Sequence, residues 1–238
     1  MPFRPVILIP VYNHDRYLRD LIEKITQKDL PVLLVDDGSG SPCSHTLDTI
    51  VRDLDNVSLI RHAKNKGKGA AIVTGFNAAA FSGFTHAFQI DADGQHDIEF
   101  IETFLQTAAQ HPESLICGYP VYDESVPALR LYSRRLTNWW VHINSMSDAV
   151  QDAMCGFRIY PLTSTCRLIR RTRIGARMES DPEIAVRLVW EGVEVVNLPV
   201  RVTYPNDGVS PFRLFRDNLR ISLMHAKLFC LMLKRRFG

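Results

Sequence analysis

The chain has 238 residues, of which 46% are hydrophobic and 23% are charged, and its formal net charge at pH 7 is +2. These proportions are ordinary for a folded domain and exclude a disordered chain. The length allows one sizeable domain with its own core, and so small a net charge gives no reason to expect nucleic-acid binding.

The five cysteines are scattered and form no C-x-x-C pair, which argues against a disulfide framework or a zinc site and favours a reducing compartment. No run of 18 or more apolar residues is present, and the first apolar run, Val6 to Ile9, is too short for the core of a signal peptide. We therefore expect a cytoplasmic protein that does not span a membrane.

The first half of the chain alternates short β-branched runs with amphipathic patterns. We predict strands at 6–9, 32–35, 57–60 and 87–90, and helices at about 17–25, 45–54 and 69–81. Strands separated by helices of this length are joined by right-handed crossovers. The expected fold is therefore an α/β fold with a mostly parallel central sheet and helices on both faces.

The pattern is looser after about residue 119. An arginine-rich helical stretch runs through Trp139 and Trp140, and then a strand at 156–160, a helix at about 182–190 and a strand at 193–198 are predicted. The tail from 212 to 238 mixes basic and apolar residues, as a final amphipathic helix would. No repeat or linker divides the chain, so we predict a single domain over 1–238.

Polar residues follow three of the predicted strands, at 10–13, 36–39 and 91–95. Ligands of open α/β sheets bind at the carboxyl ends of the strands, so we expect these three segments to meet at one edge of the sheet. Their convergence is more specific than any one of the motifs alone.

The last of these segments places Asp91, Asp93 and Gln95 in one loop after a strand. Three hard oxygen ligands suit Mg²⁺ or Mn²⁺, which usually share such ligands with substrate phosphates. The alternative is a solvated acidic turn, because Asp-x-Asp alone is common.

The segment 65–71 is glycine-rich and basic and opens a predicted helix, a combination that attracts phosphate. It lacks P-loop spacing, and no Gly-x-Gly-x-x-Gly follows the first strand, which disfavours ATPases and dinucleotide-dependent dehydrogenases. Asp36 and Asp37 suit hydrogen bonds to a base or a ribose, or else they form a capped turn.

Five segments in this order resemble glycosyltransferase family 2, and most closely its dolichol-phosphate-mannose-synthase-like branch, over residues 5 to about 225. They are Pro10-Val11-Tyr12-Asn13, Val35 to Ser39, Asn65 to Gly69, Asp91 to His96, and Cys155-Gly156-Phe157-Arg158. The resemblance implies a GT-A fold and an inverting, Mg²⁺- or Mn²⁺-dependent transfer from a UDP- or GDP-sugar. The implied acceptor is membrane-associated, either a polyprenyl phosphate or a lipid-like hydroxyl compound.

The resemblance also implies a division of the chain into three parts. Residues of about 5–118 would bind the nucleotide-sugar and the metal, about 119–211 the acceptor, and about 212–238 would form the basic C-terminal helix. The implied nucleotide-sugar ligands are Pro10, Tyr12, Asn13, Asp36, Asp37, Lys68 and Asp91; the metal ligands are Asp91, Asp93 and Gln95; the acceptor ligands are Arg130, Ser133, Arg134, Asp152 and Arg158.

Asp181, together with Asp93, is the implied catalytic residue. For an alcohol acceptor Asp181 would be the general base, whereas a phosphate acceptor is already ionised and needs none. The alternative is that Asp181 only charges the start of its helix. Three positions depart from the family pattern: His14 and Pro211 replace other residues, and Cys155 replaces a serine.

Two other functions stay open from the sequence. A sugar-phosphate nucleotidyltransferase would share the nucleotide-binding architecture, but it should carry a glycine-rich basic signature directly after the first strand. A catalytically inactive nucleotide-sugar-binding protein is the other alternative. The basic C-terminal helix either lies on the inner face of the membrane as a peripheral contact or packs on the core.

Overall fold

The computed structural model describes residues 2–122, 128–202 and 214–237. The strands are β1 (Pro5–Val11), β2 (Val32–Asp36), β3 (Val57–Arg61), β4 (His86–Gln89), β5 (Leu115–Tyr122), β6 (Arg158–Pro161) and β7 (Val195–Val202). The helices are α1 (Leu18–Thr26), α2 (Cys43–Asp53), α3 (Lys68–Phe81), α4 (Ile101–Gln110, preceded by the 3₁₀ turn η1, Ile98–Phe100), α5 (Ala128–Ser145), α6 (Leu162–Arg171), α7 (Ser180–Trp190) and α8 (Leu214–Phe237).

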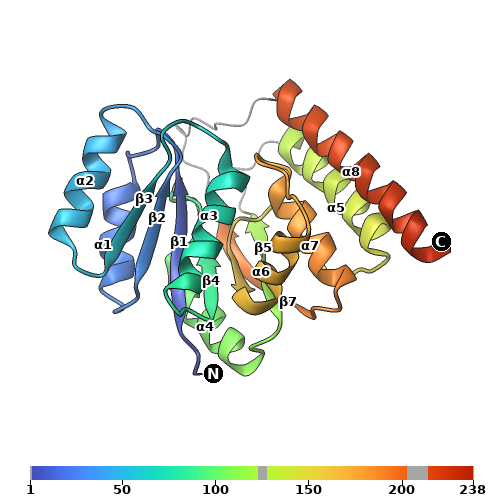
Figure 1. Ribbon diagram of the computed structural model, residues 1–238, viewed down its shortest axis with the longest axis horizontal. Helices are drawn as coiled ribbons and strands as arrows, with labels where there is room; N and C mark the ends of the chain where they lie inside the picture. The colour runs from blue at the N-terminus through green and yellow to red at the C-terminus, as the bar shows by residue number, and fades with distance from the viewer. Residues whose placement is uncertain (1, 123–127, 203–213, 238) are drawn as a thin grey trace.

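The described strands form one sheet of seven, in the order β3-β2-β1-β4-β6-β5-β7. All neighbours are parallel except β6, which runs antiparallel to both β4 and β5. The strands of both halves of the chain therefore belong to a single sheet, with helices packed around it (Figure 1). The predicted α/β fold with a mostly parallel sheet is confirmed.

Helices cover both faces of the sheet. The central strands are therefore buried on both sides, which explains why their sequences are continuous apolar runs. Along β1, Val6 and Leu8 pack into one hydrophobic cluster, while Ile7 and Ile9 pack into the other. Successive side chains of a strand point to opposite faces, so a strand that is buried on both faces is apolar at every position. The first cluster includes residues of α3, α6, α7 and α8, and the second includes residues of α1, α2 and α4.

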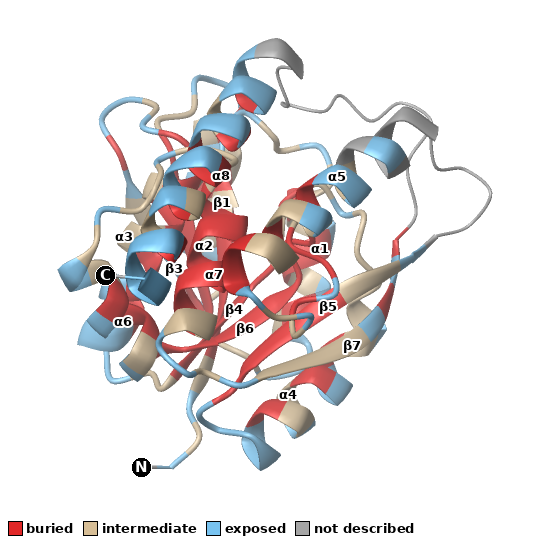
Figure 2. Ribbon diagram, turned by 90° about the vertical axis from the view of Figure 1, so that its right-hand side faces the viewer, coloured by how far each residue is buried: buried red, intermediate tan, exposed pale blue. Residues whose placement is uncertain are grey.

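Helix α7 lies inside the molecule, unlike most of the other helices. Every residue from Ser180 to Leu188 is buried, whereas the outer face of α8 is exposed (Figure 2). The C-terminal helix packs on the core through Ile221, Met224 and Leu228. This is one of the two arrangements left open by the sequence, and it leaves the other face of α8 free.

Three elements were not predicted from the sequence: α4, β5 and α6. Helix α6 begins directly after β6, and its first half is rich in threonine and serine, which favour a helix less than its leucine and arginine residues do. It is stabilised by the burial of Leu162, Thr165, Cys166 and Leu168 on its inner face. Burial against the rest of the fold thus outweighs local propensity here.

Candidate active site

The loops after β1 and β2 are hydrogen-bonded to each other. Asn13, whose φ is +48°, donates its backbone N–H to Ser39 Oγ at 2.9 Å and accepts at Oδ1 from the Gly40 N–H at 2.8 Å. Tyr12, beside it, is exposed. Because β4 is the other neighbour of β1, the structure brings the segments at 10–13, 36–39 and 91–95 to the same edge of the sheet.

The two aspartates after β2 are buried and engaged by protein groups. Asp36 accepts from the Ser39 N–H at 2.8 Å and from Arg61 Nε at 2.6 Å, which is the capped turn considered as an alternative from the sequence. Asp37 holds the loop that precedes α3: it accepts from the Lys66 and Gly67 N–H groups at 2.8 and 2.7 Å. The role of both aspartates in nucleoside binding stays a prediction.

Gly67 shows how closely that loop approaches the segment before α7. Its φ is +108°, and a Cβ at this position would lie 2.3 Å from the Ala176 carbonyl oxygen. Only glycine fits this backbone without strain. The loop therefore packs directly on the 175–180 region, which places Lys68, the first residue of α3, beside Asp181.

Lys68 links the acidic motif to α7. Its Nζ lies 2.8 and 3.0 Å from the two carboxylate oxygens of Asp91 and 3.0 Å from Asp181 Oδ2. Burial alone would lower the pKa of Lys68, but the two carboxylates raise it far above its usual value. Lys68 in turn contributes to a lowered pKa of Asp91, against the opposing effect of burial. The three groups form one charged unit, in which Asp181 is buried and Lys68 and Asp91 are partly buried.

Asp93 has a different electrostatic environment from Asp91. Burial and the neighbouring charge of Asp91 raise the pKa of Asp93, and one of its oxygens accepts only the Gln95 N–H, at 3.1 Å. A divalent cation between the two carboxylates would offset their repulsion, so the residue types fit such an ion. No three His, Cys, Asp or Glu side chains of the described residues are grouped to hold a metal alone. Gln95 and substrate phosphates would therefore have to complete the ligand set.

His96 is a site residue that sequence reasoning noted as a neighbour but gave no role. Its Nδ1 is buried without a hydrogen-bond partner among the described residues, and its ring centroid lies 5.2 Å from that of Phe157. Burial lowers the pKa of His96, against the opposing charges of Asp91 and Asp93. His96 does not complete a metal site with the two carboxylates, since the described residues hold no such group of three side chains.

The position of residue 156 next to Asp91 explains why the Cys-Gly-Phe-Arg segment has a glycine there. A Cβ there would lie 2.2 Å from Asp91 Oδ2, so any other residue would displace the carboxylate. The acidic motif of the first half of the chain thus rests directly on the segment before β6.

Of the predicted acceptor ligands, the three whose side chains the structure describes contact one another. Arg134 on α5 forms a bidentate ion pair with Asp152, with N–O distances of 2.5 and 2.8 Å. Arg158 is fully buried and donates to the carbonyl oxygens of Asp152 and Asp181 at 2.9 and 3.1 Å. In this conformation Arg158 has no surface on which to meet an acceptor, and it ties α7 to the 152–158 segment. The side chains of Arg130 and Ser133 lie outside the described residues, as does the segment around Pro211.

Asp181 lies in the first turn of α7 and is 3% exposed. Its Oδ1 accepts from Gln89 Nε2 at 3.2 Å, and its Oδ2 accepts from Lys68 Nζ at 3.0 Å. Both carboxylate oxygens are therefore engaged. Sequence reasoning missed the contacts with Lys68 and Gln89, which are 113 and 92 residues away in the chain, because no local pattern reports them.

Comparison with known sequences identifies the family. The sequence model of glycosyl transferase family 2 matches residues 6–174, which include β1 to β4, the acidic motif and the 152–158 segment. The chain belongs to this family. It is a glycosyltransferase, as the sequence predicted, and the match extends beyond the five segments that carried the resemblance.

Named relatives of this glycosyltransferase fall in the predicted polyprenyl-phosphate branch. A dolichyl-phosphate beta-glucosyltransferase of Trichomonas vaginalis is 24% identical over 212 residues, which cover 82% of the chain and 64% of that protein. A polyprenol monophosphomannose synthase of Mycolicibacterium smegmatis is 24% identical over 227 residues, which cover 91% of the chain and 83% of that protein. The chain thus spans just under two thirds of the first relative and most of the second.

Solved structures confirm the GT-A fold of the glycosyltransferase. Glucosyl-3-phosphoglycerate synthase from Mycobacterium tuberculosis, in complex with Mn²⁺ and UDP-glucose, aligns with a TM-score of 0.66 over 98% of this chain and 79% of that one, at 14% sequence identity. At this identity the likeness concerns the fold alone. Among the described helices, none is both long and apolar enough to cross a membrane.

Proposed function

We propose that the protein transfers a sugar, with inversion, from a UDP- or GDP-sugar to a polyprenyl phosphate, with Mg²⁺ or Mn²⁺ as cofactor. The named relatives act on dolichyl phosphate or form a polyprenol monophosphomannose, which supports a lipid-phosphate acceptor. The structural neighbour that binds Mn²⁺ and UDP-glucose supports a divalent cation and a nucleotide-sugar donor.

The donor would bind at the edge formed by β1, β2 and β4. Exposed Tyr12 and the loop at 13 and 39–40 would contact the nucleoside, and Lys68 with the start of α3 would attract the diphosphate. A divalent cation held by Asp91, Asp93 and Gln95 would neutralise the charge that develops on the leaving diphosphate.

The choice of acceptor rests on one observation: both oxygens of Asp181 are engaged, by Lys68 and by Gln89. A hydroxyl acceptor needs a base that can take its proton, and a carboxylate paired with a lysine is poorly suited to that role. A phosphate oxygen is already ionised. It would attack the anomeric carbon as the bond from that carbon to the nucleoside diphosphate breaks, with no proton transfer to the protein.

Membrane contact is part of this proposal. Tyr132, Leu136 and Trp139 lie on one face of α5, and Leu219 and Leu223 lie one turn apart on α8; all five are more than half exposed. The two helices lie side by side (Figure 1), joined by contacts such as that between the rings of Trp140 and Phe229, 6.2 Å apart. Exposed apolar residues beside basic ones suit the interface of an anionic membrane, and such peripheral contact fits a cytoplasmic enzyme with a lipid-linked acceptor.

The test is a transfer assay with labelled UDP-glucose and GDP-mannose. The acceptors are a short-chain polyprenyl phosphate and the matching polyprenol, each with Mn²⁺, with Mg²⁺ or with EDTA. We expect product from the phosphate alone, and only with metal. Transfer to the polyprenol but not to the phosphate would overturn the proposed acceptor.

Two further measurements address the two alternative functions. Formation of a UDP-sugar from UTP and a sugar 1-phosphate would identify a nucleotidyltransferase. Binding of the nucleotide-sugar without transfer or hydrolysis under any condition would identify an inactive binding protein. The intact set of Asp91, Asp93 and Lys68 favours the transferase over both.

A further inference from the structure

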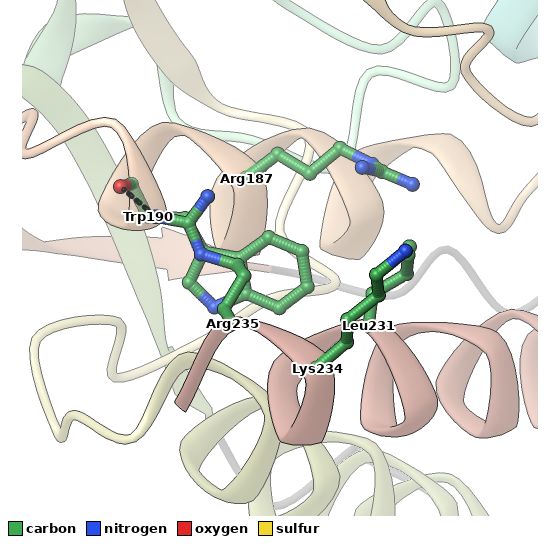
Figure 3. Close-up of a pocket in the computed structure, with 5 residues that line it drawn as sticks. All are labelled: Arg187, Trp190, Leu231, Lys234 and Arg235. Carbon is green, nitrogen blue, oxygen red and sulfur yellow. Dashed lines mark hydrogen bonds between the residues drawn. The ribbon is translucent and has the colours of Figure 1, made fainter. Parts of the chain in front are cut away.

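A hollow of about 340 Å³ lies between α7 and α8, outside the site described above. It is lined by Arg187 and Trp190 of α7 and by Leu231, Lys234 and Arg235 of α8 (Figure 3). Asp181 and Arg187 are six residues apart on α7, a separation of about 9 Å along the helix axis. The hollow is therefore close to the catalytic region but is formed by the opposite end of α7.

Three of the five lining residues are cations, and few carboxylates lie close enough to form ion pairs with them. Arg187 binds Glu183 Oε1 through Nε and Nη2 at 3.0 and 2.9 Å, and the same oxygen lies 3.9 Å from Lys227 Nζ. In the described part of the chain, no carboxylate lies within ion-pair distance of Lys234 or Arg235. Like charges gathered around one hollow repel each other, and a bound anion would relieve that repulsion.

The rest of the lining is apolar and fixes the geometry of the cations. The guanidinium of Arg235 lies 5.4 Å from the centroid of the Trp190 ring and donates to the Trp190 carbonyl oxygen at 3.0 Å. The guanidinium of Arg187 lies 5.8 Å from the centroid of the same ring. The indole is itself held by a hydrogen bond from Nε1 to the Asn144 carbonyl oxygen at 2.9 Å. The aromatic wall is thus rigid, and two cations are positioned against it.

We propose that this hollow is a second binding site of the protein, for a phosphate group that carries an apolar substituent. The phosphate would be bound by Lys234 together with the two arginines, because guanidinium groups suit phosphate oxygens. The apolar substituent would contact Trp190 and Leu231. The volume is at the lower end of the range of small-molecule sites, so the bound part is a headgroup or a short chain rather than a whole lipid.

The site is separate from the donor and acceptor sites proposed above, and it does not depend on them. Its ligand would come either from a membrane, as the headgroup of an anionic phospholipid, or from solution, as a soluble phosphate amphiphile. The chemistry of recognition is the same in both cases, so the experiment has one arm for each source.

The test measures binding of dihexanoyl phosphatidic acid below its micelle concentration, followed by calorimetry and by tryptophan fluorescence. The variants are Lys234→Ala and Arg236→Ala. Both remove one exposed positive charge from the last turns of α8, but only Lys234 lines the hollow. We expect the wild type and Arg236→Ala to bind equally, and Lys234→Ala to bind at least tenfold more weakly, with transferase activity on a soluble acceptor unchanged in all three.

Equal binding by the two variants would show attraction by surface charge alone and would overturn the site. Inorganic phosphate binding as tightly as the amphiphile would overturn the apolar half of the proposal. In the second arm, vesicles of phosphatidylcholine with and without phosphatidic acid are sedimented with each protein. Selective loss of vesicle binding in Lys234→Ala would identify the membrane as the source, and binding of the soluble lipid alone would identify a soluble amphiphile.

Discussion

The proposed donor edge and the proposed acceptor side of this glycosyltransferase are built in different ways. At the donor edge, short loops after β1, β2 and β4 carry their polar residues at the ends of buried strands. On the acceptor side, hydrogen bonds connect different elements: Asp152 accepts from Arg134 on α5 and from Arg158 on β6. Lys68 connects the two regions, because it pairs with Asp91 on one side and with Asp181 on the other. At the proposed donor edge Tyr12 is exposed, whereas in the proposed acceptor region the side chains of Asp152 and Arg158 are buried and engaged by other residues.

Removing one carboxylate of the acidic motif should have the largest effect on turnover, because this motif would hold the cation that neutralises the leaving diphosphate. Among the described residues the Asp93 side chain accepts one backbone hydrogen bond, from the Gln95 N–H, so Asp93→Asn should leave the fold intact while weakening metal binding. We expect transferase activity to fall about a thousandfold, the scale found when a strong electrostatic contribution to a transition state is lost. Activity with titrated Mn²⁺ and the thermal midpoint Tm are the measurements. Wild-type activity in this variant would remove Asp93 from the metal site.

Lys68 joins the two regions, so its loss should affect both. In Lys68→Ala the carboxylates of Asp91 and Asp181 are left buried without their shared cation. We expect the free energy of unfolding to fall by about 3 kcal/mol, as when one partner of a buried ion pair is removed. Urea denaturation measures this effect.

Lys66→Ala is the matched control for that experiment, because Lys66 is an exposed lysine of the loop that precedes α3. Its stability should match that of the wild type. An equal decrease in the free energy of unfolding in the two variants would mean that the ion pairs of Lys68 with Asp91 and Asp181 contribute no stability of their own.

The two regions also differ in how far the sequence predicts them. The strands β1 to β4 are predicted because strands buried on both faces are continuous apolar runs, as from Val6 to Ile9. The donor edge follows from the rule that ligands bind at the carboxyl ends of such strands. Sequence and topology were therefore enough to predict where Asp91 and Asp93 lie.

The acceptor side is less predictable, because its side-chain contacts depend on packing between segments that are far apart in the sequence. Arg158 is fully buried, although an arginine in a motif is most simply expected to be exposed. The engagement of Asp181 by Gln89 and Lys68 depends on the packing of α7 against β4 and α3, which no local pattern reports. The resemblance to the family implied these segments but not the contacts between them.

The junction of α5 and α8 should make the acceptor side sensitive to acid. His225 is buried there, its Nδ1 lies 3.0 Å from Asn144 Nδ2, and burial lowers its pKa to about 4. A histidine with a lowered folded pKa destabilises the fold as the pH falls below its unfolded pKa, until it is protonated in both states. Between about pH 6.5 and pH 4 we expect a loss of up to about 3 kcal/mol of unfolding free energy.

Measurement of Tm against pH for the wild type and His225→Gln would test this prediction. The variant should have a lower Tm than the wild type at pH 7, and its Tm should then fall less than that of the wild type on acidification. His45→Gln, at an exposed histidine of α2, is the control and should follow the wild type. If the Tm of His225→Gln falls with pH as steeply as that of the wild type, other groups cause the acid sensitivity.

The smallest expected effect on transfer to a phosphate acceptor is that of Asp181→Asn. The amide keeps the shape of the side chain. Its oxygen can still accept from Lys68 Nζ, and its NH2 group can donate to Gln89 Oε1 once the Gln89 amide turns over, although the ion pair with Lys68 is lost. If Asp181 only positions Lys68 and α7, transfer to polyprenyl phosphate should fall less than tenfold, with the change in the donor KM rather than in kcat. A base would behave differently: kcat would fall at least a hundredfold, and the pH profile would lose its acidic limb. That result would make Asp181 a catalytic residue and would place a hydroxyl, rather than a phosphate, at the acceptor side.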